Sequence, residues 1–77
     1  MIVVIIHTRD PHRQAEALRA ALGLTLRGSR VEVIVDAPLA TPVAKRAAET
    51  LVSFGHNVGP GDVAVAIRTA DAVEVWT

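Results

Sequence analysis

Cysteine is absent from this 77-residue chain. Disulfides, zinc–thiolate sites, iron–sulfur clusters and cysteine nucleophiles are therefore excluded. Aromatic residues are scarce, because the chain has one Trp, one Phe and no Tyr. The eight basic and eight acidic residues cancel, so the sequence lacks the excess positive charge that attracts nucleic acid or an anionic membrane. We expect neither of these partners.

Long apolar runs are also missing. The opening run, Met1 to Ile6, is far shorter than the roughly 20 residues of a transmembrane helix. It also lacks the basic n-region of a signal peptide. Hydrophobic residues make up 51% of the chain and the mean hydropathy is +0.37, which argues against disorder. The length predicts one small domain, residues 1–77, with a marginally stable monomer.

The first third of the chain predicts a strand followed by a helix. Residues Ile2 to Ile6 are β-branched without polar alternation, which is typical of a central parallel strand covered on both faces. Asp10 and Pro11 have the cap and first-turn pattern of a helix. We predict this helix over Pro11 to Arg27, ended by Gly28. Its expected apolar face consists of Leu18, Ala21, Leu22, Thr25 and Leu26.

The middle of the chain predicts a second strand and a second helix. The run Arg30 to Asp36 is a second strand, parallel to the first because a helix connects them. Thr41 and Pro42 begin a second helix that Gly55 ends. Its expected apolar face consists of Val43, Ala44, Ala47, Ala48, Leu51 and Phe54.

The C-terminal third is less regular. His56, Asn57 and Val58 form a tight link or a very short strand. The Gly59-Pro60-Gly61 segment predicts a break in regular secondary structure. Val63 to Thr69 fits either a short helix or one strand of a hairpin with the end of the chain, and we favour the helix. Val73 to Thr77 is the final strand.

This order, β-α-β-α-(β)-α-β, predicts a small three-layer α/β sandwich around a mainly parallel sheet of three to four strands. So few strands leave sheet edges and apolar helix faces uncovered. We therefore expect the chain to form a homo-oligomer or to join related small subunits.

Ligands of open α/β sheets bind beyond the carboxyl ends of the strands. The candidate residues at this edge are His7, Thr8, Arg9, Asp10, His12 and Asp36. Together with the helix N-terminus they would hold a small anion or another small molecule. The plainer alternative is that Asp10 caps the helix while Arg9 and His12 are exposed. No glycine-rich phosphate loop is present, which argues against an ordinary nucleotide.

Signals for catalysis and metal binding are weak. His7, His12 and His56 have no spacing that resembles a metal-ligand motif, so we expect no metal and no cofactor. No serine has the surroundings of an activated nucleophile. Asp10 and Asp36 could form a carboxylate pair. A helix cap at Asp10 and a turn at Asp36 are the simpler interpretations. An enzyme with His7 or His12 as general base is the third alternative.

The strand–helix–strand pattern resembles the DsrE/DsrF/DsrH-like family, which includes the TusB, TusC and TusD sulfur-relay subunits. The resemblance covers Ile2 to Pro38 through the segments TRDP, ALRAALGL and VEVIVDA, and Ala70 to Trp76 through ADAVEVW. It implies a parallel α/β fold that assembles into dimers, trimers or hexamers. It also implies cytoplasmic sulfur trafficking, in which active members carry a persulfide on a cysteine.

Because this chain has no cysteine, the carrier role and its catalytic residue do not transfer. The sequence therefore favours a non-catalytic, oligomer-forming DsrE-like protein, an accessory subunit beside a cysteine-bearing partner. The alternative is a binding module for a small molecule or anion at the edge formed by the first strand and the first helix.

Overall fold

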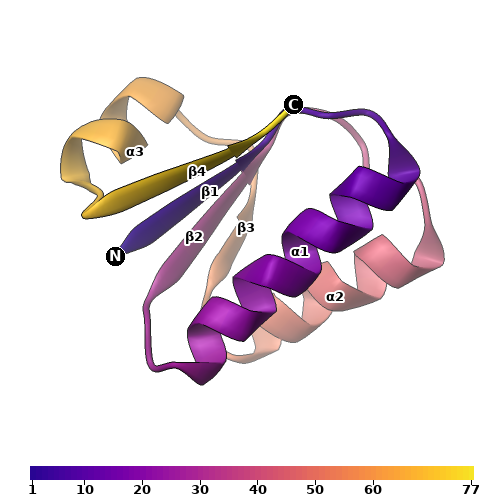
Figure 1. The fold of residues 1–77 in the computed structure, drawn as a ribbon, viewed down its shortest axis with the longest axis horizontal. Coiled ribbons are helices and arrows are strands. Elements are labelled where there is room, and N and C mark those ends of the chain that lie inside the picture. The colour runs from indigo at the N-terminus through magenta and orange to yellow at the C-terminus, as the bar shows by residue number, and fades with distance from the viewer.

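The computed structural model describes all residues 1–77 as a three-layer α/β sandwich around an all-parallel sheet (Figure 1). The strands are β1 (Ile2–Ile6), β2 (Val31–Val35), β3 (Asn57–Gly59) and β4 (Ala72–Trp76). The helices are α1 (Pro11–Leu26), α2 (Pro42–Ser53) and α3 (Val63–Thr69). The predicted fold class is therefore confirmed, and so is the helix over Val63–Thr69.

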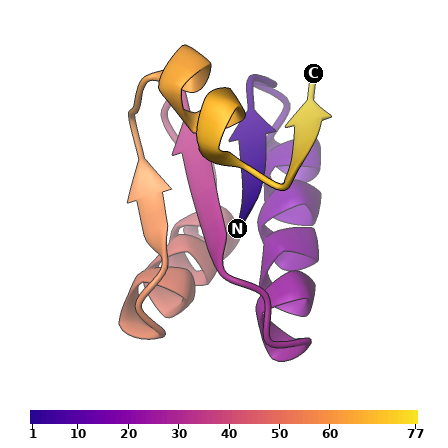
Figure 2. The ribbon, with the colours of Figure 1, turned by 90° about the vertical axis from the view of Figure 1, so that its left-hand side faces the viewer.

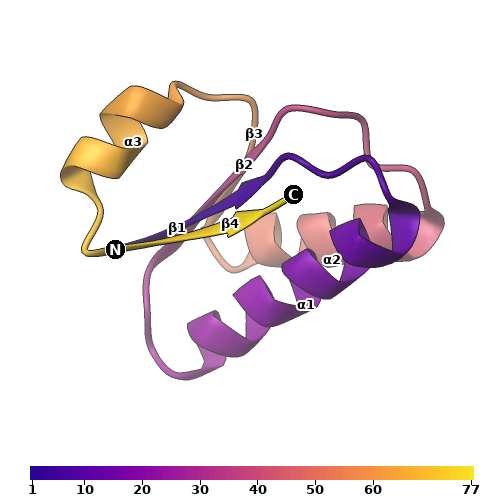
Figure 3. The same cartoon turned by 45° about the horizontal axis from the view of Figure 1, so that its top comes forward.

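The strand order is β3-β2-β1-β4 (Figure 2). The chain winds outward from β1 to β3 with α1 and α2 on one face of the sheet. It then returns past β2 and β1 through α3, on the opposite face, to reach β4 (Figure 3). The crossovers through α1 and α2 run in one direction on one face, and the crossover through α3 runs in the opposite direction on the other face. All three crossovers are therefore right-handed. This order matches the first four strands of a doubly wound sheet.

β1 lies at the centre and is buried on both faces, as the sequence predicts. Val4 and Ile6 are fully buried in the cluster with α1 and α2. Val3 and Ile5 belong to the smaller cluster on the α3 face. Alternate side chains of a strand point to opposite faces, so a continuous apolar run is what a strand between two helix layers requires.

The helix boundaries follow from their caps. Asp10 and Thr41 are N-caps, and each is followed by a proline. Gly28 and Gly55 come directly after the C-caps and have φ values of +87° and +88°, which only glycine adopts without steric cost. None of the three helices is both long and apolar enough to cross a membrane.

The predicted apolar faces of the two long helices are only partly right. In α1, Leu18 and Ala21 are buried, but Leu26 is 82% exposed. In α2, Val43 and Phe54 are also exposed. These residues lie in the first or last turns of the helices, or at a C-cap, and a four-stranded sheet is too small to cover them.

Candidate functional site

The predicted site residues lie where the sequence places them, beyond the carboxyl ends of β1 and β2. His7 follows β1 and Asp36 follows β2, and the two strands pair in parallel register. This register brings Nδ1 of His7 into contact with Oδ2 of Asp36. Both side chains face solvent, because they are 67% and 47% exposed. Asp36 therefore pairs with a histidine, and it forms no carboxylate pair with Asp10.

Asp10 uses its carboxylate to cap α1. Its Oδ1 accepts hydrogen bonds from the backbone N–H of His12 at 2.9 Å and of Arg13 at 3.2 Å. The N–H of Gln14 donates to the Asp10 carbonyl, and Pro11 has no N–H. The first turn of α1 therefore keeps no backbone donor for a bound anion.

The other three predicted residues do not converge on one point. Thr8 is buried, and its hydroxyl accepts a hydrogen bond from the N–H of Asp10 at 3.1 Å. Nε2 of His12 lies 2.7 Å from Oε1 of Glu16, one turn further along α1. Arg9 is exposed and makes no ion pair. An anion at this edge would have only exposed side chains to hold it.

Gln14 is the residue that the sequence analysis missed. Its side chain is fully buried, and its Nε2 donates to the carbonyls of Thr8 and Pro38, each at 3.1 Å. Its Oε1 accepts from the N–H of Ala40 at 3.0 Å. One amide therefore ties the loop after β1 to the loop after β2. The available signal was its position one turn before Leu18, on the buried face of α1.

His56 and Asp71 also have structural contacts. Nδ1 of His56 accepts a hydrogen bond from the N–H of Val31 at 3.2 Å. The N-terminal amino group beside Asp71 lowers the pKa of that carboxyl, first by hydrogen bonding and then by its charge. This contact is therefore present at neutral pH and lost as the pH falls through the lowered pKa. No three His, Asp or Glu side chains gather as metal ligands would.

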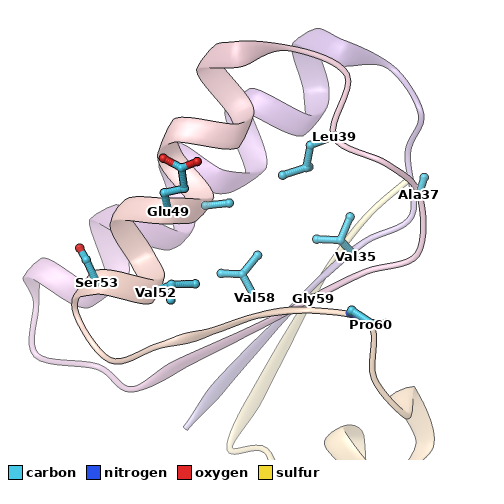
Figure 4. A pocket seen from close by; sticks show the side chains of 10 residues that line it. Val35, Ala37, Leu39, Glu49, Val52, Ser53, Val58, Gly59 and Pro60 are labelled. Carbon is cyan, nitrogen blue, oxygen red and sulfur yellow. The ribbon is translucent and has the colours of Figure 1, made fainter.

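An apolar groove lies beside α2, over the carboxyl ends of β2 and β3 (Figure 4). Its volume is about 510 Å³. Val35, Leu39 and Val58 point toward the space between α2 and the sheet. Glu49 and Ser53, one turn apart on α2, are the polar side chains of its lining. The groove holds no histidine and offers apolar contact, so it suits an apolar group better than an anion.

Replacing Gln14 tests its role as the tie between the two loops. We expect Gln14→Leu to lower the free energy of unfolding by about 2–4 kcal/mol, because it removes the donor to the buried carbonyl of Thr8 and to the part-buried carbonyl of Pro38. Gln14→Glu should destabilise at neutral pH and less at acidic pH, since burial beside two carbonyls raises the pKa of the new carboxyl. Urea unfolding measures both.

The control for Gln14 is Arg19→Leu, an exposed position on the same helix. It should change the stability by no more than about 0.5 kcal/mol. An equal loss in Gln14→Leu and Arg19→Leu would show that the buried amide has no special role.

Sulfate titration tests whether the α1 N-terminus binds anions. We expect the native protein to have the same melting temperature in millimolar sulfate as in sodium chloride of equal ionic strength. Asp10→Ala frees the N–H groups of His12 and Arg13, so sulfate should raise the melting temperature of this variant. A sulfate-specific rise in the native protein that Arg9→Ala removes would instead support the anion site.

Comparison of the chain with protein-family models, with curated proteins and with solved structures gave no match. The resemblance to the DsrE-like family therefore stays a prediction from the sequence. Any function must be argued from the arrangement of this chain's own residues.

Proposed function

We propose that this protein is a non-catalytic subunit that works by assembling with other chains. The observation that carries the proposal is the amount of apolar surface left uncovered by so small a fold. Nine large hydrophobic side chains are exposed: Leu26, Val43, Val52, Phe54, Val63, Val65, Ile67, Val73 and Val75. Exposed apolar patches on a small soluble domain mark sites of association.

The polar residues support a role without chemistry. Catalysis needs a group free to attack or to exchange a proton with a substrate. At the carboxyl edge of the sheet, Asp10 caps a helix, Gln14 joins two loops, and His7 pairs with Asp36. Asp10 and Gln14 are thus engaged in structural contacts, which favours a scaffold, whereas the Nε2 of His7 stays free to exchange a proton.

The family resemblance suggests what the assembly would serve. DsrE-like proteins form small oligomers and pass sulfur between cysteines. A chain of this kind without cysteine would act as an accessory subunit, beside a related cysteine-bearing subunit in the cytoplasm. This part of the proposal rests on the TRDP, ALRAALGL, VEVIVDA and ADAVEVW segments alone.

Native mass spectrometry and sedimentation velocity at micromolar concentration test assembly. We expect a particle whose mass is an integer multiple of 8.1 kDa, because burying apolar side chains favours association. Sulfate near molar concentration, far above the millimolar range of the anion titration, should strengthen the particle, since apolar contacts gain from this salt whereas ion pairs weaken.

A stoichiometric complex with a cysteine-bearing DsrE-like subunit, on purification from the native host, would support the sulfur-relay role. A monomer in both measurements, with no such subunit bound, would contradict the proposed function.

The groove beside α2 favours a second candidate function, the binding of a small apolar molecule. Its volume of about 510 Å³ is within the usual range of ligand sites, which are mostly apolar with a few polar groups. Glu49 and Ser53 at its side would orient a ligand that carries a hydrogen-bond donor.

A fluorescent apolar probe, anilinonaphthalene sulfonate, tests the groove. Ala48 lines the groove, so we expect saturable binding that Ala48→Phe reduces, because the larger side chain occupies the groove. Ala64→Phe, at an exposed position of α3, should leave the binding unchanged. Equal binding to the native protein and to both variants would eliminate the groove as the probe's site.

A further inference from the structure

The two edges of the sheet are not alike. β3 has three residues and is followed by Pro60, which has no backbone N–H. Short strands and proline are how natural proteins protect a sheet edge from pairing. β4 has five residues, AVEVW, without proline or lysine. It lies at the opposite edge with no strand beyond it (Figure 2). The β4 edge therefore lacks the short length and the proline that protect β3.

The backbone of β4 has groups free to pair. The N–H of His7 donates to the carbonyl of Trp76 at 2.8 Å, so Trp76 turns its carbonyl toward β1. Alternate residues of a strand turn their backbone groups to opposite sides. Val73 and Val75 consequently turn their N–H and C=O groups outward, at the free edge.

The side chains beside this edge are apolar. Val75 is in register with Ile5 and Val73 with Val3, so both valines share the sheet face that α3 partly covers. They are 57% and 39% exposed. Unpaired backbone groups and uncovered β-branched side chains occur together at β4, as they do in a strand that pairs with another chain.

We propose that a second copy of this chain pairs its β4 with this β4, antiparallel, about a two-fold axis perpendicular to the sheet. The inference rests on the proposed function and names its partner. The two-fold relation uses the same edge of each chain, so the contact is self-complementary and closed. The resulting eight-stranded sheet would end in β3 on both sides, and both of its edges would be protected.

The charges on β4 disfavour a register centred on Glu74 and favour one that brings Glu74 near a cation. Glu74 opposite the partner's Glu74 would bring like charges together, which destabilises a strand pair. Val75 opposite the partner's Val75 avoids this and places Glu74 beside the partner's Trp76. The guanidinium of Arg13 lies 5.5 Å from the centre of the Trp76 ring, so Glu74 would meet the partner's Arg13.

This register forms two ion pairs that a single chain does not make. Within one chain Arg13 and Glu74 form no ion pair, although Glu74 accepts a hydrogen bond from Nε1 of Trp76 at 2.7 Å. The two-fold axis would repeat the contact between Glu74 and the partner's Arg13. The net charge of zero adds no general repulsion between the copies.

Single cysteines test the contact, because the chain has none of its own. Val75→Cys should be linked to its counterpart by a short bismaleimide at least about tenfold faster than Val43→Cys, since pairing raises the effective concentration of the two thiols. Val43 on α2 is 58% exposed and Val75 is 57% exposed, so the two thiols start equally accessible. Far-UV circular dichroism checks that both variants fold.

Charge reversal tests the register. Arg13→Glu and Glu74→Arg should each weaken the dimer in sedimentation velocity at low salt, because each places like charges opposite one another. The double variant restores opposite charges and should recover the dimer. Weakening by both single variants without recovery in the double variant would overturn the Val75 register.

The outcomes separate this inference from the proposed function. An oligomer in which Val75→Cys is linked no faster than Val43→Cys would overturn pairing through β4 and leave assembly in place. A monomer in every measurement would overturn both. Rapid linking of Val75→Cys together with recovery in the double variant would support the β4 contact and its register.

Discussion

The central strand β1 is the constraint on which the rest of this fold depends. Its residues Val3 to Ile6 are almost completely buried, alternately beneath α3 and beneath the pair α1 and α2. A strand that is apolar on both faces needs a helix layer on each side. In a chain of 77 residues this leaves two helices for one face and a helix of seven residues for the other. The thin layer over Val3 and Ile5 is the direct reason for the exposed apolar surface beside β4.

The carboxyl edge of the sheet illustrates why a familiar binding location need not hold a ligand. In doubly wound sheets the loops at this edge supply free backbone donors and side chains. Here the carboxylate of Asp10 accepts hydrogen bonds from the backbone N–H groups in the first turn of α1. The buried amide of Gln14 joins the loop after β1 to the loop after β2. The edge is therefore stabilised by its own polar groups. The surface without internal partners lies in the apolar groove between α2 and the carboxyl ends of β2 and β3, and along β4.

The contrast between the two sheet edges connects the fold to the proposed assembly. A strand edge with free N–H and C=O groups risks uncontrolled association unless it is blunted or paired. β3 is blunted by its length and by Pro60, whereas β4 carries no such protection. When two copies of such a sheet pair through their unprotected edges about one two-fold axis, no unprotected edge remains. This contrast is the physical reason for the assembly proposed for this small domain.

The sequence by itself determined the fold class and most of the secondary structure, because the signals involved are local, but it left Val63–Thr69 open between a helix and a strand. The IVVII run, the Asp-Pro and Thr-Pro helix starts and the glycines after α1 and α2 act through neighbouring residues. Asp10 as a cap was predictable for the same reason. Only the tertiary structure decided the role of Gln14, whose partners Pro38 and Ala40 lie more than 20 residues away along the chain. It also decided that Leu26 and Phe54 stay exposed, since burial depends on how much sheet lies beneath a helix end. Pairing of His7 with Asp36 and the open edge at β4 likewise follow from strand order and register, which local patterns do not specify.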